Sequence, residues 1–68
     1  MIKLDNIVVI IENSFEEWDW KVNDVEKYGL LSLESDRYWK TKRSAVNNWK
    51  KFAKLNKIKN YTIEYDIS

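Results

Sequence analysis

Apolar residues follow two different spacings along the chain, and each spacing predicts a different kind of element. In residues 41–59 the apolar positions recur every three or four residues, which is the period of an α-helix. At about 100° per residue, Ala45, Trp49 and Phe52 fall on one side of that helix, which we expect to face the core. Elsewhere the apolar residues alternate with polar ones or form one short run, and both patterns indicate β-strands.

Four segments have the patterns of β-strands. The first is almost wholly apolar and β-branched, as expected for a central strand that is covered on both faces. In the other three, apolar and polar residues alternate, so that one side of each strand faces inward. A turn at residues 13–16 joins the first two strands into a hairpin. The predicted strands and their inward residues are 6–12; 18–22 with Trp18, Trp20 and Val22; 30–35 with Leu31 and Leu33; and 61–67 with its odd-numbered residues.

Polar residues mark both ends of the predicted helix. The hydroxyl of Thr41 can accept a hydrogen bond from the amide of Ser44, which makes Thr41 the expected N-cap, with Ser44 as the alternative one turn later. Asn56 is expected to adopt the left-handed conformation that ends a helix, after which Ile58 packs back on the last turn. Gly29, the one glycine of the chain, is expected at a backbone angle that other residues resist.

The predicted order β-β-β-α-β gives an α+β fold, in which a small antiparallel sheet carries one amphipathic helix on one face. At 68 residues the chain forms a single domain, residues 1–68. One helix covers only one face, so Val8 and Ile10 or their neighbours are left on the other. We therefore expect a homodimer, formed through that face or through the last strand. The expected core is Trp18, Trp20, Leu31, Leu33, Trp49, Phe52, Ile63 and Tyr65.

The residue types present exclude several kinds of catalytic and metal site. The chain has no cysteine and no histidine, which rules out disulfides, thiolate zinc sites and histidine-centred catalysis. Its serines have no such base to activate them. The densest carboxylates, Glu16, Glu17 and Asp19, fit a solvated turn better than a catalytic acid–base pair. We predict a non-enzymatic protein without catalytic residues, metal ligands or cofactors.

Charge is segregated along the chain although the net charge is only +1. Residues 1–36 hold nine acids and three bases, whereas residues 37–59 hold nine bases and no acid. A helix face of a single sign repels itself unless an anionic partner neutralises it. The simpler alternative is that the lysines serve solubility. The predicted binding residues are Arg37, Lys40, Arg43, Asn47, Lys50, Lys51, Lys54 and Lys57.

Two functions compete for these residues. The first is a protein-binding modulator or inhibitor, carried by a phage or mobile element, whose basic helix face and aromatic-rich sheet bind an acidic protein partner. The second is a nucleic-acid-binding module whose helix contacts the phosphate backbone, with Tyr38 and Trp39 placed to stack on bases. Small size and a composition typical of AT-rich genomes favour the first. Residues 1–5 lack the layout of a signal peptide, and the longest apolar run is far shorter than the roughly 20 residues of a membrane span, so we expect a cytoplasmic protein.

One stretch resembles the strand-to-helix junction of known small domains. Residues 38–45 have the form Y-x-x-(S/T)-K-x-x-A and are followed by Asn48, Lys51, Phe52 and Ala53. This stretch is similar to YegP-like domains of unknown function, in which an aromatic strand precedes such a helix. It also resembles the arm-type DNA-binding domain of tyrosine recombinases, which implies a sheet inserted into the major groove. The sheet residues expected to be exposed are instead mostly acidic, which argues against that mode: Glu12, Asp19, Lys21 and Glu34.

Overall fold

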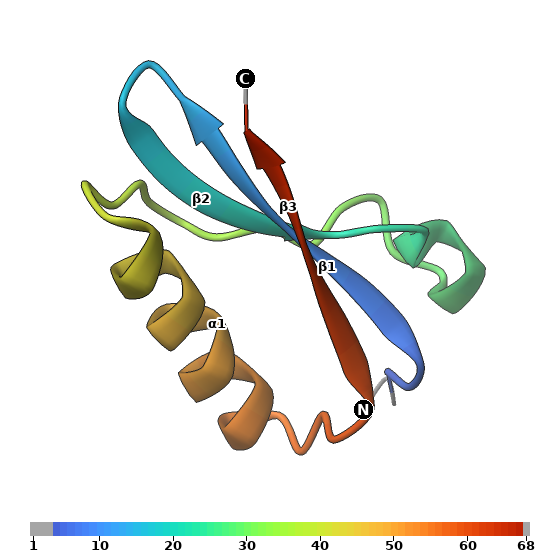
Figure 1. Cartoon of the computed structure of the whole chain (residues 1–68). Helices are drawn as coiled ribbons and strands as arrows, with labels where there is room; N and C mark the ends of the chain where they lie inside the picture. Colours follow the sequence, from blue (N-terminus) through green and yellow to red (C-terminus); the bar gives the residue numbers. More distant parts are fainter. Residues whose placement is uncertain (1–3, 68) are drawn as a thin grey trace.

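The computed structural model describes residues 4–67 and shows a three-stranded sheet with one α-helix packed on one face (Figure 1). Its elements are β1 (Ile7–Ser14), β2 (Glu17–Val22), the 3-10 helix η1 (Val25–Tyr28), α1 (Lys42–Leu55) and β3 (Tyr61–Ile67). The strands lie in the order β2-β1-β3. These features confirm the predicted α+β class and the packing of a single amphipathic helix on the sheet. Residues 1–3, part of the segment predicted not to be a signal peptide, lie outside the described part of the chain.

The sheet is mixed rather than antiparallel, which corrects the predicted arrangement of the strands. β1 pairs antiparallel with β2, but β3 pairs parallel with β1. A parallel neighbour needs a long crossover connection, and the chain between β1 and β3 supplies one because it contains β2, η1 and α1. Alternation along a strand is the same in both directions, so the pattern of residues 61–67 carried no information about direction.

Residues 30–35, predicted as a third strand, form no strand. The segment meets β2 only in isolated bridges, where Glu34 pairs with Lys21 and, further along, Trp39 pairs with Trp18. Contact begins at Leu33, whose carbonyl accepts a 2.8 Å hydrogen bond from the amide of Val22, the last residue of β2. Residues before Leu33 therefore lie beyond the end of β2. For this reason Leu31, predicted to be inward, is fully exposed.

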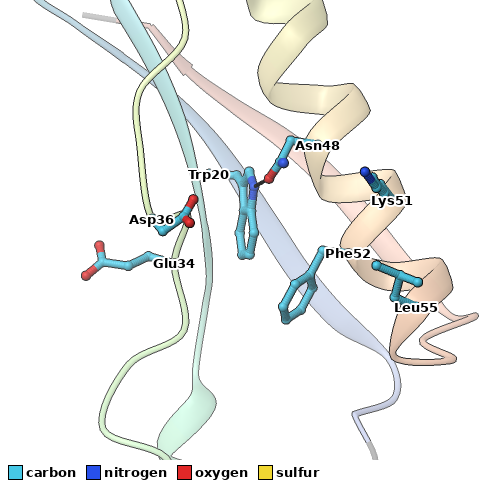
Figure 2. A pocket seen from close by; sticks show the side chains of 7 residues that line it. All are labelled: Trp20, Glu34, Asp36, Asn48, Lys51, Phe52 and Leu55. Atoms are coloured by element: carbon cyan, nitrogen blue, oxygen red, sulfur yellow. Dashed lines mark hydrogen bonds between the residues drawn. The ribbon is translucent and has the colours of Figure 1, made fainter.

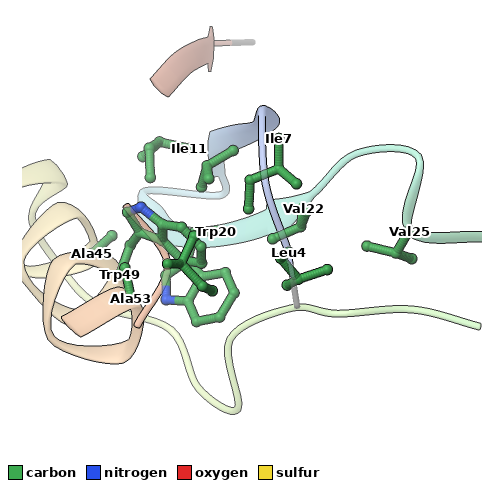
Figure 3. Close-up of a cluster of buried hydrophobic side chains, with 11 residues drawn as sticks. Leu4, Ile7, Ile11, Trp20, Val22, Val25, Ala45, Trp49 and Ala53 are labelled. Atoms are coloured by element: carbon green, nitrogen blue, oxygen red, sulfur yellow. The ribbon is translucent and has the colours of Figure 1, made fainter. Parts of the chain in front are cut away.

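The core lies between α1 and the sheet and is centred on Trp49, which is completely buried (Figure 3). The Trp49 ring contacts those of Trp20, Phe52 and Tyr61, with centroids 5.0, 5.7 and 5.3 Å away. Of the predicted core, Trp20 and Trp49 are buried, and four more residues pack partly buried against them: Trp18, Leu33, Phe52 and Ile63.

Tyr65 is the second error in the predicted core, because it is 49% exposed. It lies on β3, an edge strand, where its ring is covered on one side by Lys42, whose Nζ is 4.8 Å from the ring centroid. The alternating pattern identified the correct side of the strand but not how far the helix covers it. The side chain of Ile67, which the same pattern places inward, lies outside the described residues.

The N-terminal cap of α1 is the predicted one, whereas at the C-terminal end the left-handed residue is one position later than predicted. The hydroxyl of Thr41 accepts from the amide of Ser44 at 3.2 Å. At the other end Asn56 has a φ of −101°, and it is Lys57, at φ 58°, that takes the left-handed conformation. Ile58 is buried, as predicted, and its amide donates to the carbonyl of Ala53 at 2.8 Å. This arrangement is a Schellman motif with a lysine where glycine is preferred.

Positive φ angles shape the turn after η1 and the hairpin between β1 and β2. Gly29 has a φ of 81°, which confirms the expectation that the one glycine adopts a backbone angle that other residues resist. The hairpin between β1 and β2 turns within two residues, Phe15 and Glu16, at φ 53° and 66°. Such turns favour Asn-Gly, because both positions lie in the left-handed region. Phe15 is also 97% exposed, so no packing in the described structure offsets this strain.

Candidate interaction surfaces

The outer side of α1 is a continuous basic surface, which we name the basic helix face. Ala45, Trp49 and Ala53 are the buried residues of α1, and the residues opposite them are exposed. Ion pairs within residues 4–67 join only Lys21 to Glu12 and Arg37 to Asp36, so no cation of this face has a carboxylate within 4 Å. The basic helix face comprises Arg43, Asn47, Lys50, Lys51 and Lys54, with Lys57 just beyond the last turn.

The remaining two predicted binding residues, Arg37 and Lys40, lie in the segment that leads into α1. Both are exposed. The Nε of Arg37 is 3.6 Å from a carboxylate oxygen of Asp36, so this guanidinium is partly neutralised by its neighbour. The structure therefore gathers six of the eight predicted residues on or next to one helix face and leaves these two on its approach.

The sheet face turned away from α1 is acidic, and we name it the acidic sheet face. Cross-strand register places Asp66, Glu12 and Asp19 side by side in one row across β3, β1 and β2. The adjacent row holds Glu64, Ile10 and Lys21, and the bridge from Lys21 extends it to Glu34. Neighbouring strands lie about 4.8 Å apart, and like charges placed directly opposite destabilise a sheet. The face thus comprises five carboxylates around one lysine: Glu12, Asp19, Glu34, Glu64, Asp66 and Lys21.

Lys21 is the one base that relieves this repulsion among the described residues of the face. Its Nζ is 2.7 Å from Glu12 Oε1, and the hydrogen bond and charge of Glu12 raise the pKa of the Lys21 ammonium. The pKa of the Asp19 carboxyl is also raised. The main cause is burial, followed by the negative charges of Glu12 and Glu34. The carboxylates outnumber the available base, so the face has negative charge to offer a partner.

A groove of about 330 Å³ opens between α1 and residues 34–36 (Figure 2). Phe52 and Leu55 of α1 give it an apolar wall, and Leu55 is 73% exposed. The indole N–H of Trp20 donates to Asn48 Oδ1 at 2.9 Å and so fixes both side chains at its inner end. Asp36 and Lys51 also line it, as does Glu34, whose carboxylate points away from Trp20 and Phe52 (Figure 2). The groove adjoins the basic helix face through Lys51.

No group of three metal-ligating side chains converges within residues 4–67, and no helix among them is long and apolar enough to cross a membrane. Comparison of the chain with protein-family models, curated proteins and solved structures found no match. The resemblances to YegP-like and arm-type domains therefore stay predictions.

The basic helix face was predictable because all its residues belong to one helix of known period. The acidic sheet face was only half predictable. Glu12, Asp19, Lys21 and Glu34 were expected on it. Alternation also turns Glu64 and Asp66 away from the core, but their positions beside Ile10 and Glu12 follow only from the parallel register of β3 with β1. The available sequence signal was the pair of acids at alternate positions of β2 and of β3, together with Glu12 in β1.

Proposed function

We propose that this protein is a non-enzymatic protein-binding module whose basic helix face binds an acidic surface of its partner. The observation that carries the proposal is the row of cations on α1 without a carboxylate in ion-pair distance among residues 4–67. Exposed helices usually gain stability from Glu–Lys pairs three or four residues apart, and α1 forgoes them entirely. An acidic partner surface would remove this repulsion and speed association through electrostatic attraction.

The groove beside the basic helix face supplies the apolar contact that such an interface needs. Binding energy at protein interfaces is concentrated in a few apolar side chains that fill pockets, while charges at the rim set orientation and rate. Phe52 and Leu55 offer that apolar surface, and Lys51 links it to the charged stripe. The same proposal holds that a phage or mobile element carries the protein and that binding inhibits the partner. Both points are based on the small size and the composition of the chain.

The test is affinity capture from a nuclease-treated lysate, with a matched charge control. The variant Lys50→Glu/Lys54→Glu reverses the centre of the basic helix face, where both side chains are exposed. The control Lys27→Glu/Lys59→Glu makes the same change in net charge at exposed positions outside α1. We expect one stoichiometric protein to be captured by the wild type and by the control, and to be lost from the Lys50/Lys54 variant. Equal capture by all three would exclude the basic helix face as the binding site.

Nucleic-acid binding is the second candidate, favoured by the position of Arg43, Lys50 and Lys54 along one exposed stripe. Phosphate contacts by such a stripe require no base readout. The acidic sheet face would repel the same strand, so binding would be confined to the helix side. Loss of all captured material after nuclease treatment would support this candidate over the first.

A further inference from the structure

Among residues 4–67 no segment pairs with the outer edge of β3, whereas the outer edge of β2 is covered. Residues 33–39 cover β2 with backbone hydrogen bonds of 2.7 to 2.8 Å that link Val22 to Leu33, Trp20 to Ser35 and Trp18 to Trp39. Within residues 4–67, only β1 pairs with β3. The register between β1 and β3 runs without a bulge over the whole strand, and β3 contains no proline or lysine. Of the usual devices that protect an edge strand, proline, lysine and a bulge are thus missing from β3, and only its two acids, Glu64 and Asp66, oppose pairing.

The pairing with β1 determines which backbone groups of β3 point outward. The amide of Ile7 donates to the carbonyl of Asn60, while Ile7 lies opposite Tyr61. In a parallel ladder this pattern means that the amides and carbonyls of the even-numbered residues of β3 point toward β1. The amides and carbonyls of Ile63 and Tyr65 therefore point away from the sheet and can pair with a further strand.

Side chains on the two faces of β3 determine which residue types a strand added beside it must have. On the acidic sheet face, Glu64 and Asp66 are exposed and stand beside Ile10 and Glu12. On the helix side, Ile63 packs against the core and Tyr65 is half exposed. Because side chains alternate along a strand, a strand added next to β3 places every second residue beside these carboxylates and the others beside these apolar groups.

We propose that β3 binds an extended segment of a partner protein in which basic and apolar residues alternate, and that this segment becomes the fourth strand of the sheet. Backbone pairing would supply affinity, and Lys or Arg next to Glu64 and Asp66 would supply specificity. A second copy of this chain fits less well, since pairing β3 with β3 would bring Glu64 and Asp66 of both copies together on one face. This site is separate from the basic helix face and goes beyond the function proposed above.

The probe is a capped peptide, Thr-Lys-Val-Lys-Val-Lys-Thr, titrated into isotopically labelled protein and followed by amide chemical shifts and hydrogen exchange. We expect shifts along β3 and slower exchange of the outward amides of Ile63 and Tyr65. The same peptide with glutamate in place of lysine should not bind. Glu64→Gln/Asp66→Asn should weaken binding of the lysine peptide roughly tenfold at low salt.

Two matched changes test the backbone pairing itself. Tyr65→Pro removes an outward donor at an edge position where proline is tolerated, and Tyr65→Val is its control because it keeps the donor and an apolar side chain. We expect the proline variant to lose at least roughly tenfold in affinity relative to the valine variant. A peptide methylated on the amides that face β3 should lose binding to the wild type, which tests the same bonds even if Tyr65→Pro fails to fold.

Three results would overturn the inference. These are no binding of the lysine peptide at low salt, equal binding of the methylated peptide, and sedimentation as a dimer that Tyr65→Pro dissociates while Tyr65→Val does not. The last result would assign the edge to a second copy, as expected from the sequence. None of them bears on the Lys50→Glu/Lys54→Glu capture experiment, so the two proposals can fail independently.

Discussion

The rings of Trp20 and Trp49 meet edge to face, with centroids 5.0 Å apart and planes 67° apart. Only one of their two N–H groups has a hydrogen-bond partner within residues 4–67. Trp20 donates to Asn48 at 2.9 Å at the border of the groove. Trp49 is completely buried, and its Nε1 has no hydrogen-bond partner within residues 4–67. The two tryptophans thus join β2 to α1 in one aromatic contact. The N–H of Trp20 adds a hydrogen bond to this contact, whereas the N–H of Trp49 adds none among the described residues.

We predict that shortening Trp49 unfolds the protein but that replacing it with another aromatic does not. Trp49→Ala should cost about 3 to 5 kcal/mol, which is comparable with the whole stability of a small domain. Trp49→Phe should cost distinctly less, because it keeps a ring in the core and removes a buried N–H that has no partner among the described residues. Thermal unfolding followed by circular dichroism measures both. A cooperative transition of Trp49→Ala near that of the wild type would contradict the assigned position of the helix.

The carboxyl of Asp19 should make stability fall as the pH rises from acidic to neutral. Burial, and then the charges of Glu12 and Glu34, raise its pKa above the ordinary 3.8. The folded state therefore holds the proton at pH values where the unfolded chain has released it, so the contribution of this group is most favourable below 3.8 and declines as the pH rises through the raised value. We expect Asp19→Asn to be more stable than the wild type at neutral pH.

The measurement is urea unfolding of both proteins across the acidic range. The advantage of Asp19→Asn should disappear once the pH is below 3.8, where both side chains are uncharged in both states. Glu26→Gln, at an exposed position on η1, is the control for the change in net charge. A constant advantage at every pH would show that the effect of Asp19→Asn does not come from titration.

Lys57→Gly should stabilise the protein by about 1 kcal/mol, because Lys57, the residue after the C-cap of α1, is left-handed at φ 58° and glycine adopts this conformation without a Cβ penalty. Lys54→Gly is the control, since it removes the same side chain inside α1. It should destabilise by about 1 kcal/mol. Denaturant midpoints at constant m-value give both differences. The changes in unfolding free energy of the two variants must have opposite signs if Lys57 is the left-handed residue that ends the helix.

Replacing Phe15-Glu16 with Asn-Gly should stabilise the hairpin by roughly 1 to 2 kcal/mol. Both residues have positive φ, and Phe15 is almost fully exposed, so the replacement relieves strain without removing packing. Phe15→Ala is the control, since it removes the ring and leaves the strain. It should change the unfolding free energy by much less than the double replacement, as measured by thermal and urea unfolding.

If the basic helix face contacts phosphates, we expect roughly three to five of them to be neutralised and a log–log salt slope of roughly −3 to −4. Binding of labelled single-stranded and duplex oligonucleotides, followed by fluorescence anisotropy at several salt concentrations, measures this slope. Lys50→Glu/Lys54→Glu should abolish binding without affecting the fold, because both side chains are exposed. Binding that survives the double substitution would place the contact elsewhere on the protein.

The sequence by itself determined the helix, its N-cap, the hairpin and the α+β class, because each depends on residues close together in the chain. A period of 3.6 residues and the hydroxyl of Thr41 suffice to place α1, and they also place the basic helix face on its outer side. That candidate surface was therefore predicted almost in full from local pattern.

Only the tertiary structure decided what depends on pairing between distant segments. Strand direction leaves no trace in an alternating pattern, so the parallel return of β3 was unpredictable, and with it the row that unites Asp66, Glu12 and Asp19. The exposure of Leu31 and Tyr65 likewise depends on where β2 ends and how far α1 reaches across the sheet. Burial and register are properties of the assembled layers, which is why the rows of the acidic sheet face and the edge position of β3 in the described sheet emerge only when the chain is folded.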